Sequence, residues 1–312
     1  MVDNKQQWKA WLYLLPAIIL LLIFTVWPII NTTRLAFLNG YGIMTDLGGD
    51  VQWQIGIENF IKVIDYRGFK ACLTNTLLLT VITVPVSTLL ALLVAVGLNS
   101  IKFLNRLLQT IYFLPYVTNS IAIGMVFAMM FNIVGTVDYT VTAGIINNIL
   151  GLFGIEPINW INAGSEHWAN LTVMCVYIIW SALPFKILIL LGGLQSVNKQ
   201  YYDAAKIDAA SKSTVFWRIT VPLLSPMLAY VIITGFIGGF KEYSSIVGIF
   251  GESMGPAGGP SYGQMNTMVG FIYSQLGSDN EGRASAAALI LFGIILVVTA
   301  INSYVSTKKV HY

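Results

Sequence analysis

Long apolar runs separated by polar segments dominate the chain. Six runs reach about 20 residues or more, the length with which an α-helix crosses the hydrocarbon of a bilayer. Backbone groups in lipid must be hydrogen-bonded within the segment, so each run predicts a spanning helix and the fold class is all-α, a polytopic membrane protein. The expected spans are residues 11–32, 73–98, 107–131, 169–194, 221–249 and 284–305, within a single transmembrane domain covering 1–312.

The polar segments between the runs predict the orientation. With six spans, both termini and two of the loops lie on one side, and these segments hold ten basic and three acidic residues. The segments of the other side hold five basic and ten acidic residues. Basic residues collect on the cytoplasmic side, so the termini and the segment 196–218 are expected there. Outside, residues 143–154 predict a short amphipathic helix at the interface, and 251–263 are too rich in glycine and proline for a helix.

Composition narrows the function. The chain is 56% hydrophobic and 10% charged, against about a quarter charged in soluble domains, and its net charge of +3 does not suggest nucleic acid. It has no G-x-x-x-x-G-K-[ST] loop for nucleotide phosphates. Its two histidines, His167 and His311, are expected on opposite faces of the membrane, so neither a metal site nor a histidine-based catalytic centre is expected.

One polar stretch, YYDAAKIDAASKSTVFWRITVPLLSP (201–226), stands out against this apolar background. Its alanines favour a helix over 199–210 and permit close approach by another surface, and Ser196 is a candidate cap for its start. Ser211 and Ser213 end the pattern before the next span. An ordinary solvated loop helix is the simpler interpretation.

The order of residues in this stretch resembles the EAA loop of ABC importer permeases, specifically the sugar-permease branch related to maltose and glycerol-phosphate permeases. The matching residues are Asp203, Ala204, Ala205, Asp208, Ala209, Ile219 and Pro222. Further resemblance lies in the first span, in GIENF (56–60), FLPYV (113–117), INW (158–160), LILLGGLQSV (188–197) and GPAGGP (255–260). The resemblance therefore covers nearly the whole chain and implies the type I ABC importer permease fold.

The resemblance implies that 196–218 forms a coupling helix that docks on an ATPase subunit, with Asp203 as polar anchor and the alanines as the packing face. Two residues depart from the family pattern. Asp203 replaces the usual Glu, and Ala209 stands where the family usually has Gly. A left-handed turn at Ala209 would cost roughly 1–2 kcal/mol, so either the turn is not left-handed or docking offsets the strain.

Ionisable residues inside spans are costly and are candidates for function. There are three, Lys186, Lys241 and Glu242, of which the last two, on a helix, would point about 100° apart. Lys241 could instead reach the outer headgroups, and Lys186 could make a structural contact. With the residues that the resemblance implies, the candidates for the substrate path are Asn119, Ala182, Phe185, Lys186, Gly235, Gly238, Gly239, Lys241, Glu242 and Tyr243.

These candidates leave the substrate open. The three glycines could widen a cavity or allow close helix packing. Lysines in the cavity would suit an acidic, uronate-containing saccharide, and Glu242 as an acceptor would suit a neutral sugar. The sequence thus predicts a permease subunit of a carbohydrate ABC importer in a bacterial plasma membrane. A permease for a non-sugar solute such as glycerol phosphate, a secondary carrier, and a membrane enzyme or channel are the alternatives.

The resemblance also implies the partners: a paralogous second permease, two ATPase subunits and an extracytoplasmic solute-binding protein. It implies no cofactor in this chain, because ATP and magnesium would be held by the ATPase subunits.

Overall fold

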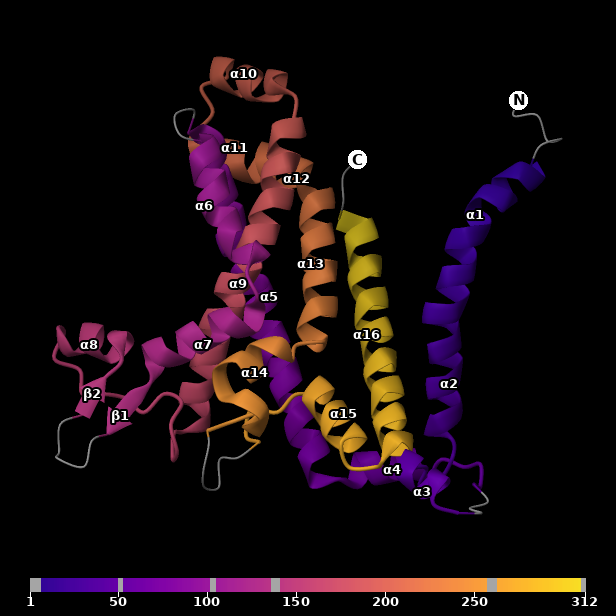
Figure 1. The fold of residues 1–312 in the computed structure, drawn as a ribbon. Helices are drawn as coiled ribbons and strands as arrows, with labels where there is room; N and C mark the ends of the chain where they lie inside the picture. The colour runs from indigo at the N-terminus through magenta and orange to yellow at the C-terminus, as the bar shows by residue number, and fades with distance from the viewer. Residues whose placement is uncertain (1–6, 50–52, 102–104, 136–140, 257–262, 310–312) are drawn as a thin grey trace. The chain divides into compact units, whose positions relative to one another are not determined.

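The computed structural model describes residues 7–49, 53–101, 105–135, 141–256 and 263–309. Two compact units divide the chain. The first comprises residues 1–70 and 271–292, and the second comprises 71–270 and 293–312. Both are mainly helical, as expected, and the described strands form one two-stranded ribbon (Figure 1).

The first unit is built on one long helix and a group of short ones. α1 (Gln7–Leu21), a π-turn (Leu22–Val26) and α2 (Trp27–Ala36) form one continuous apolar helix. It is followed by α3 (Ile43–Leu47) and α4 (Glu58–Asp65), and the unit also contains the starts of α5 (Arg67–Ser100) and α16 (Glu281–Lys309) and most of α15 (Met268–Leu276). Asp279 carboxylate oxygens accept hydrogen bonds from the backbone N–H groups of Met44 and Thr45, which fixes the start of α3.

The second unit holds the helices that matter for the site. After α5 come α6 (Asn105–Val117), α7 (Ser120–Phe131), β1 (Ile133–Gly135), β2 (Val141–Ala143), α8 (Ile145–Gly151) and α9 (His167–Ser196). Then follow α10 (Lys199–Ile207), α11 (Lys212–Val215), the π-turn η3 (Phe216–Thr220), α12 (Val221–Leu223), α13 (Ser225–Phe240) and α14 (Ser244–Phe250). β1 and β2 pair antiparallel, and α8 lies where the short amphipathic helix is expected.

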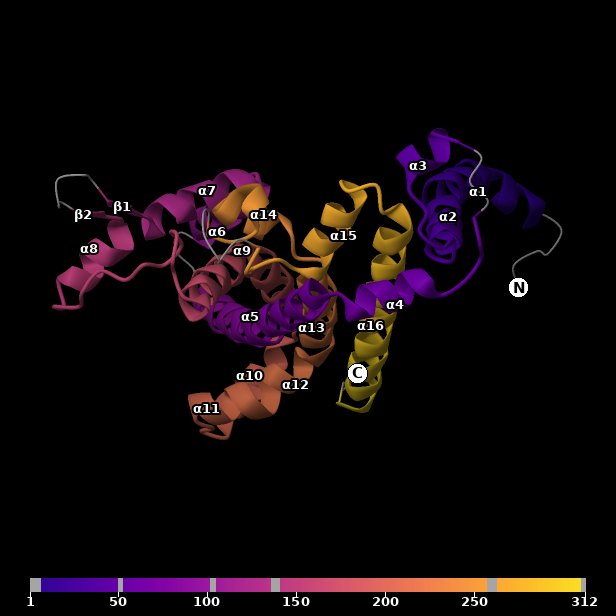
Figure 2. The ribbon, with the colours of Figure 1, turned by 90° about the horizontal axis from the view of Figure 1, so that it is seen from below.

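Two apolar clusters hold the second unit together. One joins α5, α9 and α13 through residues such as Leu92, Leu190 and Val231, all buried. The other joins α7, α9 and α14, which lie together in both ribbon views (Figures 1 and 2). α7 and α14 approach closely because two glycines face each other: a Cβ added at Gly124 would lie 2.7 Å from the Cα of Gly248.

Four of the six expected spans are single helices, long and apolar enough to cross a membrane: Trp8–Ala36, Arg67–Ser100, His167–Ser196 and Glu281–Ser306. The other two expected spans, 107–131 and 221–249, each contain a bent pair of helices instead of one continuous helix. The first is broken into α6 and α7, which meet at 97°. The Asn119 side chain causes the restart, since its Oδ1 accepts hydrogen bonds from the N–H groups of Ile121 and Ala122.

The expected span 221–249 is interrupted twice. Its helices bend by 67° at Leu224, next to Pro226, which has no backbone N–H to continue the helical ladder. The helix then ends at Phe240, and α14 starts at Ser244, so Lys241 and Glu242 lie in a break rather than on a continuous helix. Apolar side chains on both sides of each interruption hide these breaks from hydropathy.

Candidate functional site

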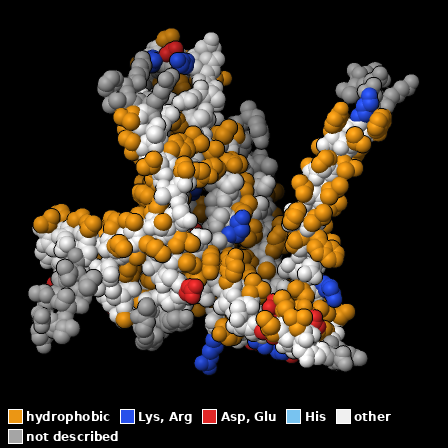
Figure 3. Space-filling view, in the orientation of Figure 1, with side chains coloured by type: hydrophobic (Ala, Val, Ile, Leu, Met, Phe, Trp, Pro, Cys, Tyr) orange, Lys and Arg blue, Asp and Glu red, His pale blue; other side chains and the backbone are white. Residues whose placement is uncertain are grey.

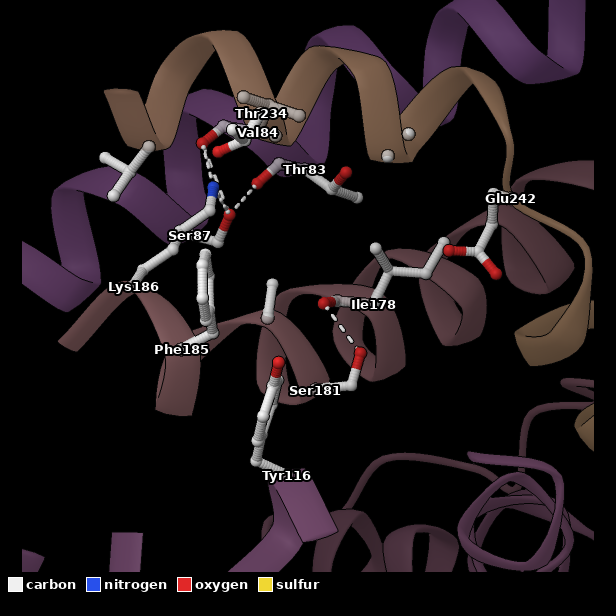
Figure 4. Close-up of a pocket in the computed structure, with 15 residues that line it drawn as sticks. Thr83, Val84, Ser87, Tyr116, Ile178, Ser181, Phe185, Lys186, Thr234 and Glu242 are labelled. Carbon is white, nitrogen blue, oxygen red and sulfur yellow. Dashed lines mark hydrogen bonds between the residues drawn. The ribbon is translucent and has the colours of Figure 1, made fainter. Parts of the chain in front are cut away.

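The second unit contains a cavity of about 310 Å³ between α5, α6, α9 and α13. Seven of the ten expected substrate-path residues line it: Ala182, Phe185, Lys186, Gly235, Gly238, Gly239 and Glu242. Its other lining residues are Thr83, Val84, Ser87, Tyr116, Ile178, Ser181, Val231 and Thr234 (Figure 4). Asn119, Lys241 and Tyr243 are not among the lining residues. Asn119 instead caps α7, and Lys241 is exposed.

Lys186 is the one lining residue with a positive charge, and it is only 4% exposed. Its ammonium group donates to the Val84 carbonyl oxygen at 3.1 Å, to Ser87 Oγ at 2.7 Å and to Thr88 Oγ1 at 2.9 Å. All three acceptors belong to α5. Lys186 therefore joins α9 to α5 through the cavity wall, as the structural interpretation of this residue predicts.

Glu242 lies at the other end of the cavity, in the break between α13 and α14 (Figure 4). Its Oε1 accepts hydrogen bonds from the backbone N–H groups of Tyr243 and Ser245, each at 3.1 Å. The carboxylate thus caps the N-terminus of α14, where a negative charge is favoured. Thr267 reinforces the break by donating to the Glu242 carbonyl oxygen at 2.8 Å.

The three glycines of α13 play different roles. A Cβ at Gly239 would lie 2.8 Å from the Thr80 side chain, so this glycine allows close packing of α13 on α5. A Cβ at Gly238 would meet no atom within 4 Å, so this glycine adds open space. Gly235 is intermediate, because a Cβ added there would lie 3.0 Å from the Val84 side chain and 3.3 Å from the Lys186 Nζ. Both interpretations of the glycines therefore hold, at different positions.

Aromatic rings form one wall of the cavity. Tyr116 of α6 stacks on Phe185 of α9, with ring centroids 5.8 Å apart and an angle of 19° between the planes. Tyr116 and the α5 residues Thr83 and Ser87 are not among the residues expected from the sequence. A signal was present in α5, because Thr76, Thr80, Thr83 and Ser87 recur at three- and four-residue intervals and so mark one polar face of a helix.

A second candidate site is the surface helix α10, which carries charged side chains at one end of the second unit (Figure 3). Asn198 caps it, with its Oδ1 accepting from the Gln200 N–H at 3.0 Å. The expectation that Ser196 caps this helix was wrong, because α9 continues to Ser196 and its hydroxyl donates to the Gly193 carbonyl oxygen.

The end of α10 is a Schellman turn. The N–H of Ala210 donates to the Ala205 carbonyl oxygen at 2.9 Å, and the N–H of Ala209 donates to that of Lys206 at 3.1 Å. Ala209 has φ +51°, a left-handed conformation that favours glycine. The alternative in which this turn is not left-handed is therefore excluded, and Ala209 carries the strain.

The residues of the EAA-like pattern fall into exposed and buried groups. Asp203 and Ala204 are exposed, as are Asp208 and Ala209, while Ala205 is only 6% exposed. Asp203 pairs with Lys206 at 2.8 Å, and the hydrogen bond and charge of Lys206 lower the pKa of Asp203 below its ordinary value. Ile219 and Pro222 are half-buried, in η3 and α12.

Comparison with known proteins places the chain in a family. Residues 87–311 match the model of the binding-protein-dependent transport system inner membrane component. The chain belongs to that family. The chain is accordingly a multi-pass transport permease and not an enzyme, and the resemblance to sugar-importer permeases is confirmed.

Proteins similar to this chain include transport permeases with named substrates. The arabinooligosaccharides transport system permease protein AraP of Bacillus subtilis is 32% identical, over 94% of this chain and 86% of the relative. The lactose transport system permease protein LacF of Rhizobium radiobacter is 29% identical, over 94% and 91%. A chain from the crystal structure of a bacterial ABC transporter involved in the import of the acidic polysaccharide alginate superposes with a TM-score of 0.77 at 21% identity, covering 98% and 97% of the two chains.

Proposed function

We propose that this chain is a permease subunit of an ATP-driven carbohydrate importer in a bacterial plasma membrane. It would form the translocation path with a second, paralogous permease, receive its ligand from an extracytoplasmic solute-binding protein, and be driven by two ATPase subunits that bind ATP and magnesium. The relatives named for arabinooligosaccharides and lactose support a carbohydrate ligand.

One structural observation carries the proposal. The helices that line most of the cavity, α9 and α13, are the same two helices that the α10–α12 segment connects. A force applied to α10 would reach both walls of the cavity through short connections. Tyr202 strengthens this connection, since its hydroxyl lies 3.4 Å from the Thr220 hydroxyl of η3. The arrangement suits a device in which docking at one end changes the shape of the cavity at the other.

In this proposal the exposed part of α10 docks on the ATPase. Asp203 supplies a charged contact, and the small side chains of Ala204 and Ala209 allow close approach. Closure of the ATPases on ATP would move α10, and α9 and α13 would move with it, which opens the cavity to the other side of the membrane. The cavity would hold the ligand, with Phe185 and Glu242 among the residues that border it and Lys186 buried in its wall.

The test is ATP hydrolysis by the complete complex in lipid, with and without loaded binding protein. Asp203→Lys is expected to reduce the stimulated rate to the basal rate and to weaken assembly, because it reverses an exposed charge at the contact. Glu156→Lys makes the same charge change on the exposed loop after α8 and is expected to keep full stimulation. Unchanged stimulation and assembly in Asp203→Lys would mean that α10 does not transmit the ATPase motion.

A further inference from the structure

The polar side chains of the cavity are short of hydrogen-bond donors. The hydroxyl of Ser181 donates to the Ile178 carbonyl oxygen at 3.1 Å, and that of Thr234 donates to the Tyr230 carbonyl oxygen at 2.7 Å. Each hydroxyl has one proton, so both side chains can offer only lone pairs to a ligand. Thr83 uses its proton in the same way, on the Leu79 carbonyl oxygen. Among the described lining side chains, the Tyr116 hydroxyl keeps an uncommitted donor.

Lys186 does not make up the shortage. An ammonium group has three N–H donors, and the three acceptors on α5 occupy all of them. The side chain is also 4% exposed, so a ligand cannot reach it without displacing α5 contacts. Lys186 therefore contributes a positive charge to this end of the cavity but no free hydrogen bond.

Glu242 contributes the opposite charge at the other end. It is half-buried, and one of its carboxylate oxygens points toward the cavity (Figure 4). When it is ionised, a carboxylate has no proton to donate, so it can only accept hydrogen bonds. Within the described part of the chain, neither Glu242 nor Lys186 forms an ion pair. The cavity thus presents one charge of each sign, acceptors within reach of a ligand, and a stacked aromatic wall.

We propose that this cavity selects neutral saccharides and disfavours acidic ones. A neutral sugar supplies many hydroxyl donors for Ser181, Thr234 and Glu242, and an apolar ring face for Tyr116 and Phe185. A uronate brings acceptors to an acceptor-rich wall and a negative charge toward Glu242, and the buried charge of Lys186 attracts it without offering a free donor. A cationic ligand would supply donors but would meet the charge of Lys186. The inference rests on the proposed carbohydrate function and names its substrate class.

The experiment compares neutral and acidic probes on the complete complex in lipid, without binding protein, by saturation-transfer NMR, which detects weak binding. The probes are arabinotriose, lactose and maltotriose as neutral sugars, and an alginate trisaccharide as the acidic one. At least one neutral probe is expected to bind about tenfold more tightly than the alginate trisaccharide.

Two variants assign the preference to this cavity. Glu242→Gln keeps an oxygen that can cap α14 but removes the charge, so it is expected to improve binding of the alginate trisaccharide by about tenfold and to change binding of the neutral probe by less than about threefold. Thr234→Val removes one cavity acceptor and is expected to weaken only the neutral probe, by about threefold. Glu156→Gln, outside the cavity, is the matched control and is expected to change neither.

The possible outcomes distinguish the preference for neutral sugars from the proposed carbohydrate transport on which it rests. Tighter or equal binding of the alginate trisaccharide by the unmodified complex would overturn the selection of neutral sugars and leave carbohydrate transport standing. An unchanged preference in both Glu242→Gln and Thr234→Val would overturn it as well, because the preference would then arise elsewhere in the complex. Binding of none of the four probes would overturn the carbohydrate function itself.

Discussion

The helix α10 and the cavity place their polar groups in opposite ways. On α10 the paired side chains of Asp203 and Lys206 are 65% and 77% exposed, and their charges stay in water. In the cavity Lys186 is buried, and hydroxyls such as that of Thr234 are bonded to their own helices. Exposed charges cost little and are available to another protein, whereas buried ones must be satisfied within the fold. The contrast separates a surface suited to a partner from a pocket suited to a ligand that brings its own donors.

The end of α10 and the cavity also differ in where the chain uses glycine. The chain places a side chain at Ala209, where the backbone has φ +51° and glycine would fit better. It places glycines at 238 and 239, where a helix would be more stable with alanine. Close approach explains Gly239 and open space explains Gly238. Met254 and Asp279 also have positive φ, but of these three residues Ala209 is the exposed one, and it lies in the segment proposed to dock.

The largest expected effect is that of Lys186→Glu. This change sets a carboxylate against the three acceptors of α5 and leaves a buried negative charge without a donor. We expect a loss of about 3–5 kcal/mol, enough to abolish assembly of the complex. Lys186→Met fills a similar volume without charge and should assemble. The yield of the complex and its Tm measure both effects. An equal loss of yield and Tm in the two variants would contradict the assignment of Lys186 as a link between α9 and α5.

The next effect compares two neighbouring glycines. Gly239→Ala brings a Cβ to 2.8 Å from Thr80, whose own hydroxyl is fixed by a hydrogen bond to the Thr76 carbonyl oxygen. A loss of about 1–3 kcal/mol is expected, because α13 must move away from α5. Gly238→Ala meets open space and should be neutral or stabilising by up to about 1 kcal/mol. Thermal unfolding of the complex in lipid tests both, and the same shift for the two variants would exclude close packing at Gly239.

Much of this architecture could be predicted from the sequence, for reasons that differ between the regions. Four spans are continuous apolar helices, so length and hydropathy were sufficient. The breaks at Asn119 and at Lys241 depend on single side chains that cap the next helix, and apolar neighbours conceal them. A single capping side chain changes the average hydropathy of a segment of about 20 residues very little, so hydropathy does not reveal the break.

The site was predictable in part, too. Seven of the ten expected residues line the cavity, because they come from two helices that flank the recognisable stretch 201–226. The α5 residues of the cavity were not predicted. Thr83 and Ser87 lie more than 90 residues from that stretch in the sequence and reach the cavity only through packing. It could not be predicted either that acceptors on α5 occupy all three N–H groups of Lys186, because these contacts depend on the distance between the helices.

A smaller effect is expected at the end of α10. Ala209→Gly relieves a left-handed residue and should stabilise the turn by about 1 kcal/mol. Ala204→Gly, on the same exposed helix but with helical geometry, should destabilise it by about 1 kcal/mol. Hydrogen exchange at the amides of residues 205–210 measures both changes. If Ala209→Gly speeds exchange as Ala204→Gly does, the strain assigned to Ala209 is absent.

The smallest effect concerns the ion pair on α10. The hydrogen bond and charge of Lys206 lower the pKa of Asp203, so the pair adds stability above the pKa of the unfolded chain. That contribution is lost as the pH falls through the lowered value, on the acid side of the ordinary pKa of an aspartate. An ordinary aspartate is already ionised between about pH 6 and pH 8, so the lowering by Lys206 changes no charge in this range. We expect Lys206→Gln to change substrate-stimulated ATP hydrolysis by less than about twofold across this range, because exposed pairs contribute little. A pH-dependent step that is present in the unmodified complex and disappears in Lys206→Gln would show that docking depends on the pair and not on the Asp203 charge alone.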